Sequence, residues 1–276
     1  MNHVRVVHLL VSAALALTPG LASTYTTNFS GFSSGSINGQ NGWSVTGPFD
    51  QSITTFSGSN VFQMSNETAS TTFADMPYSA ALPALAGEGT PYNFFSTTFT
   101  FHSATGAGQN GLDLQVGPYN AGETGRQNLF EITDTGSGGL DVGFWDTDGS
   151  GNFNEHSIGS GLSYTDWHTA TMNIVFNPGP GNDVVTVWLD GNLIGTFNSF
   201  DSYYPLFEPG TDSTVDSVLF RARNAGTGLT GNGLYFGSLS LTETSVPEPA
   251  SATMLAAGLF GLLLVPRRRP PASRES

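Results

Sequence analysis

The sequence predicts an all-β domain with the architecture of a jelly-roll β-sandwich, on three observations. Glycine contributes 35 and proline 15 of the 276 residues, and both residue types disfavour the interior of a helix. Short runs rich in Phe, Val, Thr and Tyr alternate with clusters of Gly, Asn, Asp and Ser, as strands alternate with turns. No repeat recurs at a fixed period of about 20–50 residues, so a sandwich is favoured over a barrel or a propeller.

Residues 1–23 are predicted to form a signal peptide. Arg5 stands in a short polar head, an apolar run extends from Val6 to Leu17, and small residues at Gly20 and Ala22 occupy the positions that a signal peptidase reads. We therefore expect the chain to be exported and exclude this segment from the fold. The absence of cysteine means that the body, residues 24–245, depends on its core for stability and has no disulfides.

The body is expected to contain at least ten strands. In the run Val184–Leu189 both faces are largely apolar, which suits a strand in an inner layer. Asp190 and Gly191 follow it and supply the positive-φ turn of a hairpin. The expected strands are Val61–Met64, Asn93–Phe101, Leu112–Val116, Leu129–Thr133, Leu140–Trp145, Thr169–Phe176, Val184–Leu189, Leu193–Phe197, Ser217–Ala222 and Leu234–Leu241.

The last segment, residues 246–276, differs from the body in composition. Its apolar run Ala250–Val265 would form a helix about 24 Å long at ~1.5 Å per residue, against a bilayer core of about 30 Å. We expect a single C-terminal apolar helix that reaches the membrane, with the following arginines on the cytoplasmic side and the body outside. The residues that flank the run are Val246, Pro247, Glu248 and Pro249 before it and Arg267, Arg268 and Arg269 after it.

This order of a Pro-Glu-Pro motif, an apolar helix and an arginine cluster resembles the PEP-CTERM sorting signal of bacterial proteins. The resemblance covers about a tenth of the chain. It implies that an exosortase-type membrane enzyme is a partner, that the tail is processed near the Pro-Glu-Pro motif, and that the membrane contact precedes processing. It further implies localisation in the cell envelope, at the cell surface or in the extracellular matrix of a Gram-negative bacterium that makes exopolysaccharide.

Part of the body resembles LamG-like, concanavalin A-like lectin and glucanase domains, which are jelly-roll β-sandwiches. Gly237 stands where many relatives carry an acidic residue in the final strand, so the resemblance does not extend to a metal site on that strand. The segments that carry the resemblance are Gly39–Trp43, Trp167–Met172, Asn177–Val185, Leu189–Gly191, Tyr203 with Tyr204, and Gly233–Leu241.

The charge of the chain is divided unevenly among the segments. There is no lysine, and of the eight arginines only Arg126, Arg221 and Arg223 lie in the body, against 20 acidic residues, so the body has a net charge of −17. Nucleic acid is excluded as a partner because it requires a broad basic surface. The negative net charge of the body favours a solvated acidic surface, or cation bridging to an acidic matrix, over direct attraction to anionic polymers. Arg221 and Arg223, two residues apart, are expected on one strand face, paired with local acids.

One loop has the oxygen ligands that a hard cation prefers. Asp146, Asp148, Ser150 and Asn152 stand at alternate positions, as in the first half of a calcium loop. Ser157 occupies the place of the bidentate glutamate, and the flanking segments are predicted strands, so an EF-hand is not expected. The alternative is a polar hairpin tip. Calcium is therefore the single candidate cofactor.

Five aromatic residues beside turn-rich segments are candidates for glycan contact, since Trp and Tyr rings serve as flat platforms for sugars. They are Trp43, Trp145, Trp167, Tyr203 and Tyr204. The alternative for each is packing at the edge of the sandwich. Extracellular polysaccharide is accordingly the second candidate partner.

The sequence identifies no catalytic residues. The Glu-x-Asp-x-x-Glu pattern of jelly-roll glucanases is absent, and Glu131, Asp134 and Asp141 have no evident partner at the ~5–9 Å separation that glycoside hydrolysis requires. We therefore expect a non-enzymatic exported surface or matrix protein with weak glycan binding. The alternatives are a glycan-active hydrolase of the same fold, which two carboxylates facing across a groove would favour, and a purely structural matrix protein.

Overall fold

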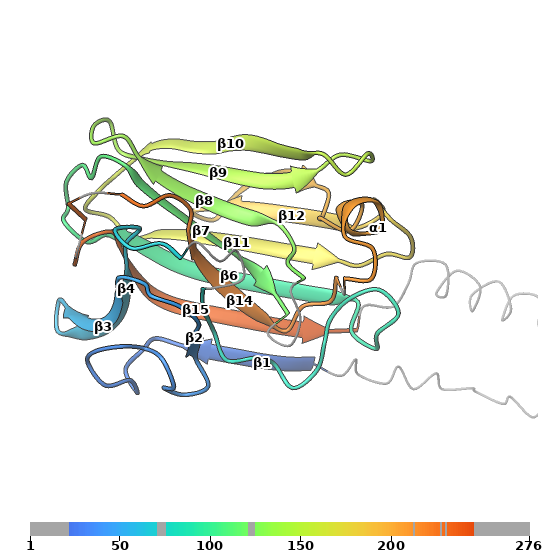
Figure 1. The fold of residues 1–276 in the computed structure, drawn as a ribbon, viewed down its shortest axis with the longest axis horizontal. Helices are drawn as coiled ribbons and strands as arrows, with labels where there is room; N and C mark the ends of the chain where they lie inside the picture. Colours follow the sequence, from blue (N-terminus) through green and yellow to red (C-terminus); the bar gives the residue numbers. More distant parts are fainter. Residues whose placement is uncertain are drawn as a thin grey trace, which may run out of the picture.

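The computed structural model describes residues 22–70, 76–120, 125–211, 213–226, 228–229 and 231–245, which form two packed antiparallel sheets (Figure 1). The predicted all-β sandwich is confirmed. The first strand, β1, begins at Ala22, so Ala22 and Ser23 belong to the sheet although they were assigned to the signal peptide. The rest of that peptide and the C-terminal segment lie outside the described residues. Within the described ranges, no helix has the length and apolar character needed to cross a membrane.

Sheet A has the strand order β13-β12-β11-β6-β15-β4-β3, with β1 paired to β15 beside this path. Its longest strands, β6 and β15, pair along almost their whole length at the centre. The bounds are β1 (Ala22–Thr27), β3 (Gln51–Phe56), β4 (Ser59–Met64), β6 (Phe94–Ser103), β11 (His168–Val175), β12 (Val184–Leu189), β13 (Asn192–Phe197) and β15 (Leu234–Thr244).

Sheet B has the strand order β10-β9-β8-β7-β14-β5-β2. The short helix α1 (Tyr203–Phe207) lies at one end of the strands (Figure 1). The bounds are β2 (Ser44–Val45), β5 (Pro77–Tyr78), β7 (Leu112–Tyr119), β8 (Leu129–Asp134), β9 (Leu140–Thr147), β10 (Phe153–Leu162) and β14 (Ser217–Ala222).

The alternation of side chains along each strand divides sheet B into an inner and an outer face. Even-numbered residues of its central strands, such as Leu114, Phe130 and Phe220, are buried in the core between the sheets. Odd-numbered residues consequently lie on the outer face. This register matters because the odd-numbered positions of β7, β8 and β14 include charged and amide side chains where the core-facing positions are apolar.

The hairpin predicted at Asp190 and Gly191 is confirmed, because both residues have positive φ, 50° and 76°, between β12 and β13. The expectation of an inner-layer strand at Val184–Leu189 is wrong. β12 lies next to the edge strand and buries one face only, and Val184 is 40% exposed. β1, β3 and β10 escaped prediction because they are rich in Ser, Thr, Asn and Gly, and their apolar content does not distinguish them from turns.

Candidate functional site

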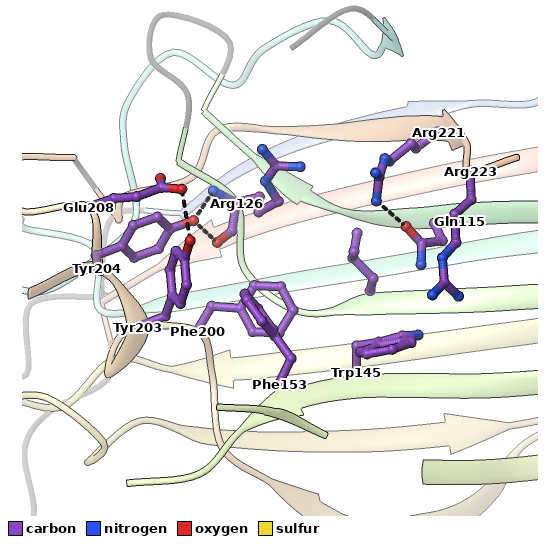
Figure 2. A pocket seen from close by; sticks show the side chains of 11 residues that line it. Gln115, Arg126, Trp145, Phe153, Phe200, Tyr203, Tyr204, Glu208, Arg221 and Arg223 are labelled. Carbon is purple, nitrogen blue, oxygen red and sulfur yellow. Dashed lines mark hydrogen bonds between the residues drawn. The ribbon is translucent and has the colours of Figure 1, made fainter. Parts of the chain in front are cut away.

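A pocket of about 210 Å³ lies on the outer face of sheet B, beside α1 (Figure 2). Strands β7, β8, β9 and β14 supply its floor, and α1 with the segment before it supplies one wall. The lining residues are Gln115, Arg126, Leu129, Trp145, Phe153, Phe200, Tyr203, Tyr204, Glu208, Arg221 and Arg223.

All three arginines of the body line this one pocket. Arg221 stands opposite Gln115 in the β14–β7 pairing, and its Nη1 donates a hydrogen bond of 2.8 Å to the Gln115 amide oxygen. Arg126 is 9% exposed, and burial lowers the pKa of both Arg126 and Arg221. Because arginine starts from so high a pKa, both side chains remain cationic at neutral pH. The few cations of an acidic protein are thus concentrated at a single point.

Arg223 is held by an acid and an aromatic ring. Its Nη1 donates to the buried carboxylate of Glu131, and its guanidinium carbon lies 5.0 Å from the centre of the Trp145 ring. The Trp145 indole N–H also donates to Glu131. Arg221 and Arg223, which the sequence places on one face, both line the pocket, where Arg223 pairs with Glu131 and Arg221 donates to the amide of Gln115.

Three carboxylates meet beside this ion pair. Asp113 of β7 and Glu155 of β10 each come within hydrogen-bonding reach of Glu131 on β8. Gly143 of β9 lies between Glu131 and Glu155, and a Cβ there would approach the Glu155 carboxylate oxygen to 2.9 Å. The glycine therefore leaves the space in which the acids from β8 and β10 approach each other.

Asp113 keeps its proton to a higher pH than a solvent-exposed aspartate does, because it is buried beside Glu131. Burial and the neighbouring Glu131 raise the pKa of Asp113 to about 6. Burial also works to raise the pKa of Glu131, but hydrogen bonds from Trp145, Arg223 and Asp113 outweigh it and lower that pKa. The Asp113 Oδ1 atom is buried and finds no hydrogen-bond donor among the described residues when the carboxyl is ionised. A proton on Asp113 supplies the missing hydrogen bond.

This pair leads to a pH-dependent prediction. Between the unfolded pKa of Asp, about 3.9, and the folded value of about 6, the folded state binds more protons, so the Asp113 contribution to stability falls as pH rises. Asn at position 113 keeps a donor toward Glu131 at every pH. Asp113→Asn is expected to raise the free energy of unfolding by about 1 kcal/mol at pH 7.5 and to change it little at pH 4.5, measured by urea denaturation. Equal effects at both pH values would contradict the raised pKa of Asp113.

The wall of the pocket is aromatic. The Tyr203 hydroxyl donates to Glu208 Oε1 at 2.9 Å, and its ring lies 4.7 Å from that of Phe153 and 5.2 Å from that of Phe207. Burial and the Glu208 carboxylate raise the pKa of Tyr203. The Tyr203 phenol is therefore a protonated, half-buried donor that is paired with a carboxylate at the pocket rim. Phe153 and Phe207, 45% and 56% exposed, extend the aromatic surface outward.

The five candidate glycan contacts fall in three different places. Trp145, Tyr203 and Tyr204 line the pocket, although the Tyr204 hydroxyl is buried and bonds the Arg126 backbone at both its N–H and its carbonyl. Trp167, 41% exposed, lies by a hollow over sheet A. Trp43 is 1% exposed in the core, so this residue cannot contact a ligand in the folded protein.

The burial of Trp43 has a measurable consequence. Its ring contacts Phe29, Phe62 and Phe220, and its indole N–H donates to the Tyr25 hydroxyl at 2.8 Å. Trp43→Ala is expected to lower the free energy of unfolding by about 3–5 kcal/mol, because it removes a large buried ring and leaves a cavity. The half-exposed Trp167 is the matched control, with an expected loss of about 1 kcal/mol for Trp167→Ala. Equal losses in urea denaturation would contradict the assignment of Trp43 to the core.

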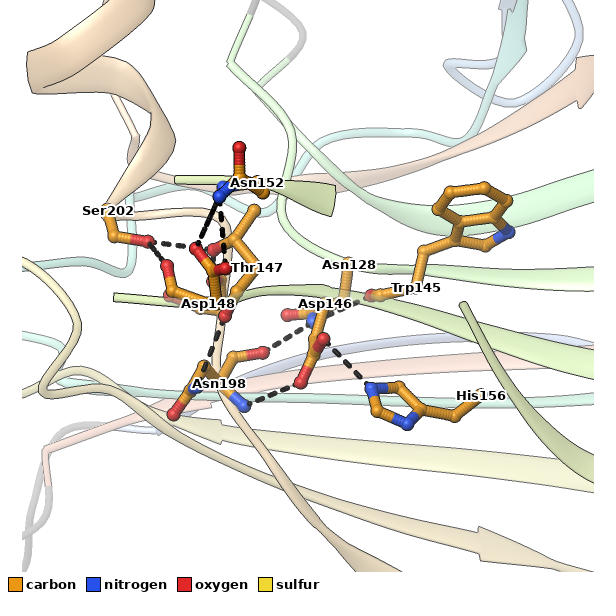
Figure 3. A network of polar contacts seen from close by, with 10 residues as sticks. Asn128, Trp145, Asp146, Thr147, Asp148, Asn152, His156, Asn198 and Ser202 are labelled. Atoms are coloured by element: carbon orange, nitrogen blue, oxygen red, sulfur yellow. Dashed lines mark hydrogen bonds and ion pairs between the residues drawn. The ribbon is translucent and has the colours of Figure 1, made fainter. Parts of the chain in front are cut away.

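The predicted calcium loop forms the tip of the β9–β10 hairpin (Figure 3). The Asp148 carboxylate accepts hydrogen bonds from the backbone N–H groups of Ser150 and Asn152. Asp146 is directed elsewhere, toward His156 Nε2 at 3.0 Å and the backbone N–H of Asn198. Within the described ranges, no group of three or more His, Asp or Glu side chains is arranged to hold a metal ion. Calcium binding stays a prediction from the sequence.

The sequence comparisons return no relatives: no protein-family model and no curated protein matches the chain. Several solved structures are similar in fold. A variant of the alginate lyase Aly36B in complex with alginate tetrasaccharide has 12% identity and a TM-score of 0.48, covering 79% of this chain and 96% of its own. Alginate lyase vAL-1 from Chlorella virus has 13% identity and a TM-score of 0.42, covering 77% and 99%.

A third structure of similar fold is a module of a phage protein. The CBM2 module of the evolved Dit protein of Lactobacillus casei BL23 phage J-1 has 11% identity and a TM-score of 0.44, covering 83% of this chain and 99% of its own. Any activity of this chain has to be argued from its own pocket.

The sequence-based prediction of a non-enzymatic protein is corrected. It depended on the absence of neighbouring carboxylates, and the fold brings Asp113, Glu131 and Glu155 together from three strands. The solved structures of similar fold include alginate lyases, which are enzymes, whereas the sequence-based prediction was of a non-enzymatic protein. The acids were missed because each stands on a different strand, and their proximity depends on register.

Proposed function

We propose that the protein is a glycan-active enzyme that cleaves an anionic polysaccharide built from uronate units. One observation carries this proposal: Arg126, Arg221 and Arg223, the only cations of a body with net charge −17, line a single pocket that also contains aromatic and amide side chains. Guanidinium groups bind carboxylates with paired hydrogen bonds, and aromatic rings support sugar faces. A uronate unit has both a carboxylate and a sugar face.

The same pocket favours elimination over hydrolysis. A hydrolase needs two carboxyl groups about 5–9 Å apart with the sugar between them, whereas the Glu131 carboxylate is already engaged by the Trp145 indole N–H and by Arg223. Elimination instead needs cations to stabilise the charge that develops on the uronate carboxylate, together with a proton acceptor and a proton donor. Arginines and the Tyr203–Glu208 pair supply these groups.

Residues of the pocket supply and accept every proton that the proposed step moves. Glu208 accepts the proton from C5 of the uronate, the C4–O bond breaks with its electron pair on oxygen, and Tyr203 donates a proton to that oxygen. The products are a chain end with a C4=C5 double bond and a new reducing end. Proton transfer from Glu208 to Tyr203 along their 2.9 Å hydrogen bond then restores the starting state.

The experiment combines two assays on purified protein with polygalacturonate, alginate and their carboxyl-reduced counterparts. We expect new reducing ends together with ultraviolet absorbance from the C4=C5 double bond, on a uronate polymer only. Reducing ends without the absorbance would indicate the hydrolase alternative. Activity on none of the polymers, or equal activity on the carboxyl-reduced ones, would overturn the proposal.

We further propose that the concanavalin A-like body reaches the cell surface through its PEP-CTERM tail, with an exosortase-type enzyme as processing partner. The order of motif, apolar run and Arg267–Arg269 supports this address. The intact mass of the protein released from the producing cells tests it. A mass without Arg267–Arg269 is expected, and a mass that retains them would contradict processing.

A further inference from the structure

A second aromatic surface lies on the opposite sheet from the pocket. Trp167 directly precedes β11, and its ring lies over Gly237 of β15, where an added Cβ would approach two ring atoms to 2.8 and 2.9 Å. Gly237 is the extra residue of a bulge, since Phe236 pairs with Phe101 and Ser238 with Thr100. The bulge and the missing side chain together make room for the indole, as bulges do where a side chain has to be redirected.

The Trp167 ring is held in place by other aromatic side chains and remains accessible. Its centre lies 5.2 Å from that of His102 and 6.0 Å from that of Phe56, which comes from the β3–β4 hairpin. Trp167 is nevertheless 41% exposed. A large ring that is fixed by packing but open on one side loses little conformational freedom when a ligand stacks on it.

Two adjoining hollows beside this ring are lined by hydroxyl and amide groups. They have volumes of about 620 and 600 Å³ and adjoin at Asn28 and Ser30, which line both, and together they are treated as one groove over sheet A. None of the residues that line them has a charged side chain. The lining includes Asn28, Ser30, Ser59, Thr98, Thr100 and Ser238.

Hydroxyl groups of this groove are ordered by bonds across the strands. The Thr98 and Thr171 hydroxyls lie 2.9 Å apart, and those of Thr100 and Ser238 lie 3.0 Å apart. Each hydroxyl has one proton and two lone pairs, so such pairs retain capacity for a further hydrogen bond. An ordered, uncharged array of this kind is complementary to the hydroxyls of a sugar chain.

We propose that this groove, named here the Trp167 groove, is a second glycan-binding site that takes an uncharged polysaccharide. One sugar ring stacks on Trp167, and the next units lie along the Ser, Thr and Asn side chains. The absence of charge from the groove lining distinguishes it from the arginine pocket on sheet B. The site would hold the protein on a neutral polysaccharide chain while the pocket on sheet B, in its proposed function, cleaves an anionic one.

The test uses the indole N–H signals of the ¹⁵N-labelled protein, titrated with cellohexaose, mannohexaose, xylohexaose and trigalacturonate. We expect at least one neutral oligosaccharide to shift the Trp167 signal, assigned through Trp167→Phe, while the Trp145 signal stays unchanged. Trp167→Ala is expected to weaken that binding about 10-fold or more.

A second variant keeps the test independent of folding effects at Trp167. Ser59 is exposed on the hairpin that borders the groove, so Ser59→Arg places a long side chain in the groove and removes no packed group. It is expected to abolish the shift and to leave cleavage of uronate polymers unchanged. The proposal would be overturned if no neutral oligosaccharide shifted the Trp167 indole signal, or if trigalacturonate shifted it equally. Unchanged affinity in both variants would also overturn it.

Discussion

A Tyr203→Phe protein is expected to bind an oligouronate as tightly as the wild type does and to cleave it about 10²–10⁴-fold more slowly. The ring that forms the pocket wall is retained, so contacts with Phe153 and Phe207 persist. The change removes the hydroxyl that donates to Glu208, and with it the proposed proton donor. Loss of a positioned general acid typically costs a rate factor of this size.

Separate measurement of kcat and KM distinguishes a role of Tyr203 in the chemical step from a role in substrate binding. A fall in kcat at constant KM assigns Tyr203 to the chemical step, while a rise in KM alone assigns it to substrate binding. Glu208→Gln is the companion variant, because it keeps a hydrogen-bond acceptor for Tyr203 and removes the proposed base. Tyr204→Phe would be a poor control, since the Tyr204 hydroxyl bonds buried backbone groups of Arg126. Full activity of Tyr203→Phe would exclude the proposed step.

Replacement of Arg221 is expected to weaken oligouronate binding about 10–100-fold. A hydrogen bond to a charged group contributes about 1.5–3 kcal/mol, and each 1.4 kcal/mol is a tenfold change in affinity. Arg221→Gln removes the cation and keeps a polar side chain beside the amide of Gln115. Arg221→Lys keeps the charge but loses the planar fork, so it is expected to fall between the wild type and Arg221→Gln.

Arg223 requires a different design, because its removal alone would leave Glu131 buried without its cation, which destabilises a fold strongly. The double variant Arg223→Gln with Glu131→Gln removes both charges. It is expected to remain folded and to bind the oligouronate less tightly than the wild type, as measured by calorimetry at constant ionic strength. Unchanged affinity in this variant and in Arg221→Gln would contradict a role for the pocket in anion binding.

The sequence predicts the strands of this protein better than it predicts the pocket. Alternation along Ser217–Ala222 places Arg221 on one face, and turn chemistry at Asp190 fixes a hairpin, because both depend on neighbouring residues in the chain. Proximity of Asp113 to Glu131 depends instead on how β7 pairs with β8, where Gln115 stands opposite Glu131. Strand pairing between distant segments has no local signature.

The charge composition of the body leads to a different expectation from the function proposed for the pocket. The strongly acidic body favoured repulsion of anionic polymers, which treats its charge as evenly spread. The fold gathers Arg126, Arg221 and Arg223 at one place, so the local charge differs from the average charge.

The central claim is that these three arginines bind the carboxylates of an anionic glycan, and their own NMR signals test it most directly. In protein labelled with ¹⁵N-arginine, the Nε–H resonances of Arg126, Arg221 and Arg223 can be assigned by substitution and followed during titration with trigalacturonate and trimannuronate. The expected result is a saturable shift of all three resonances with at least one of the two sugars, and none with the carboxyl-reduced trisaccharides. Resonances that do not move with either uronate, or that move equally with the reduced sugars, would contradict it.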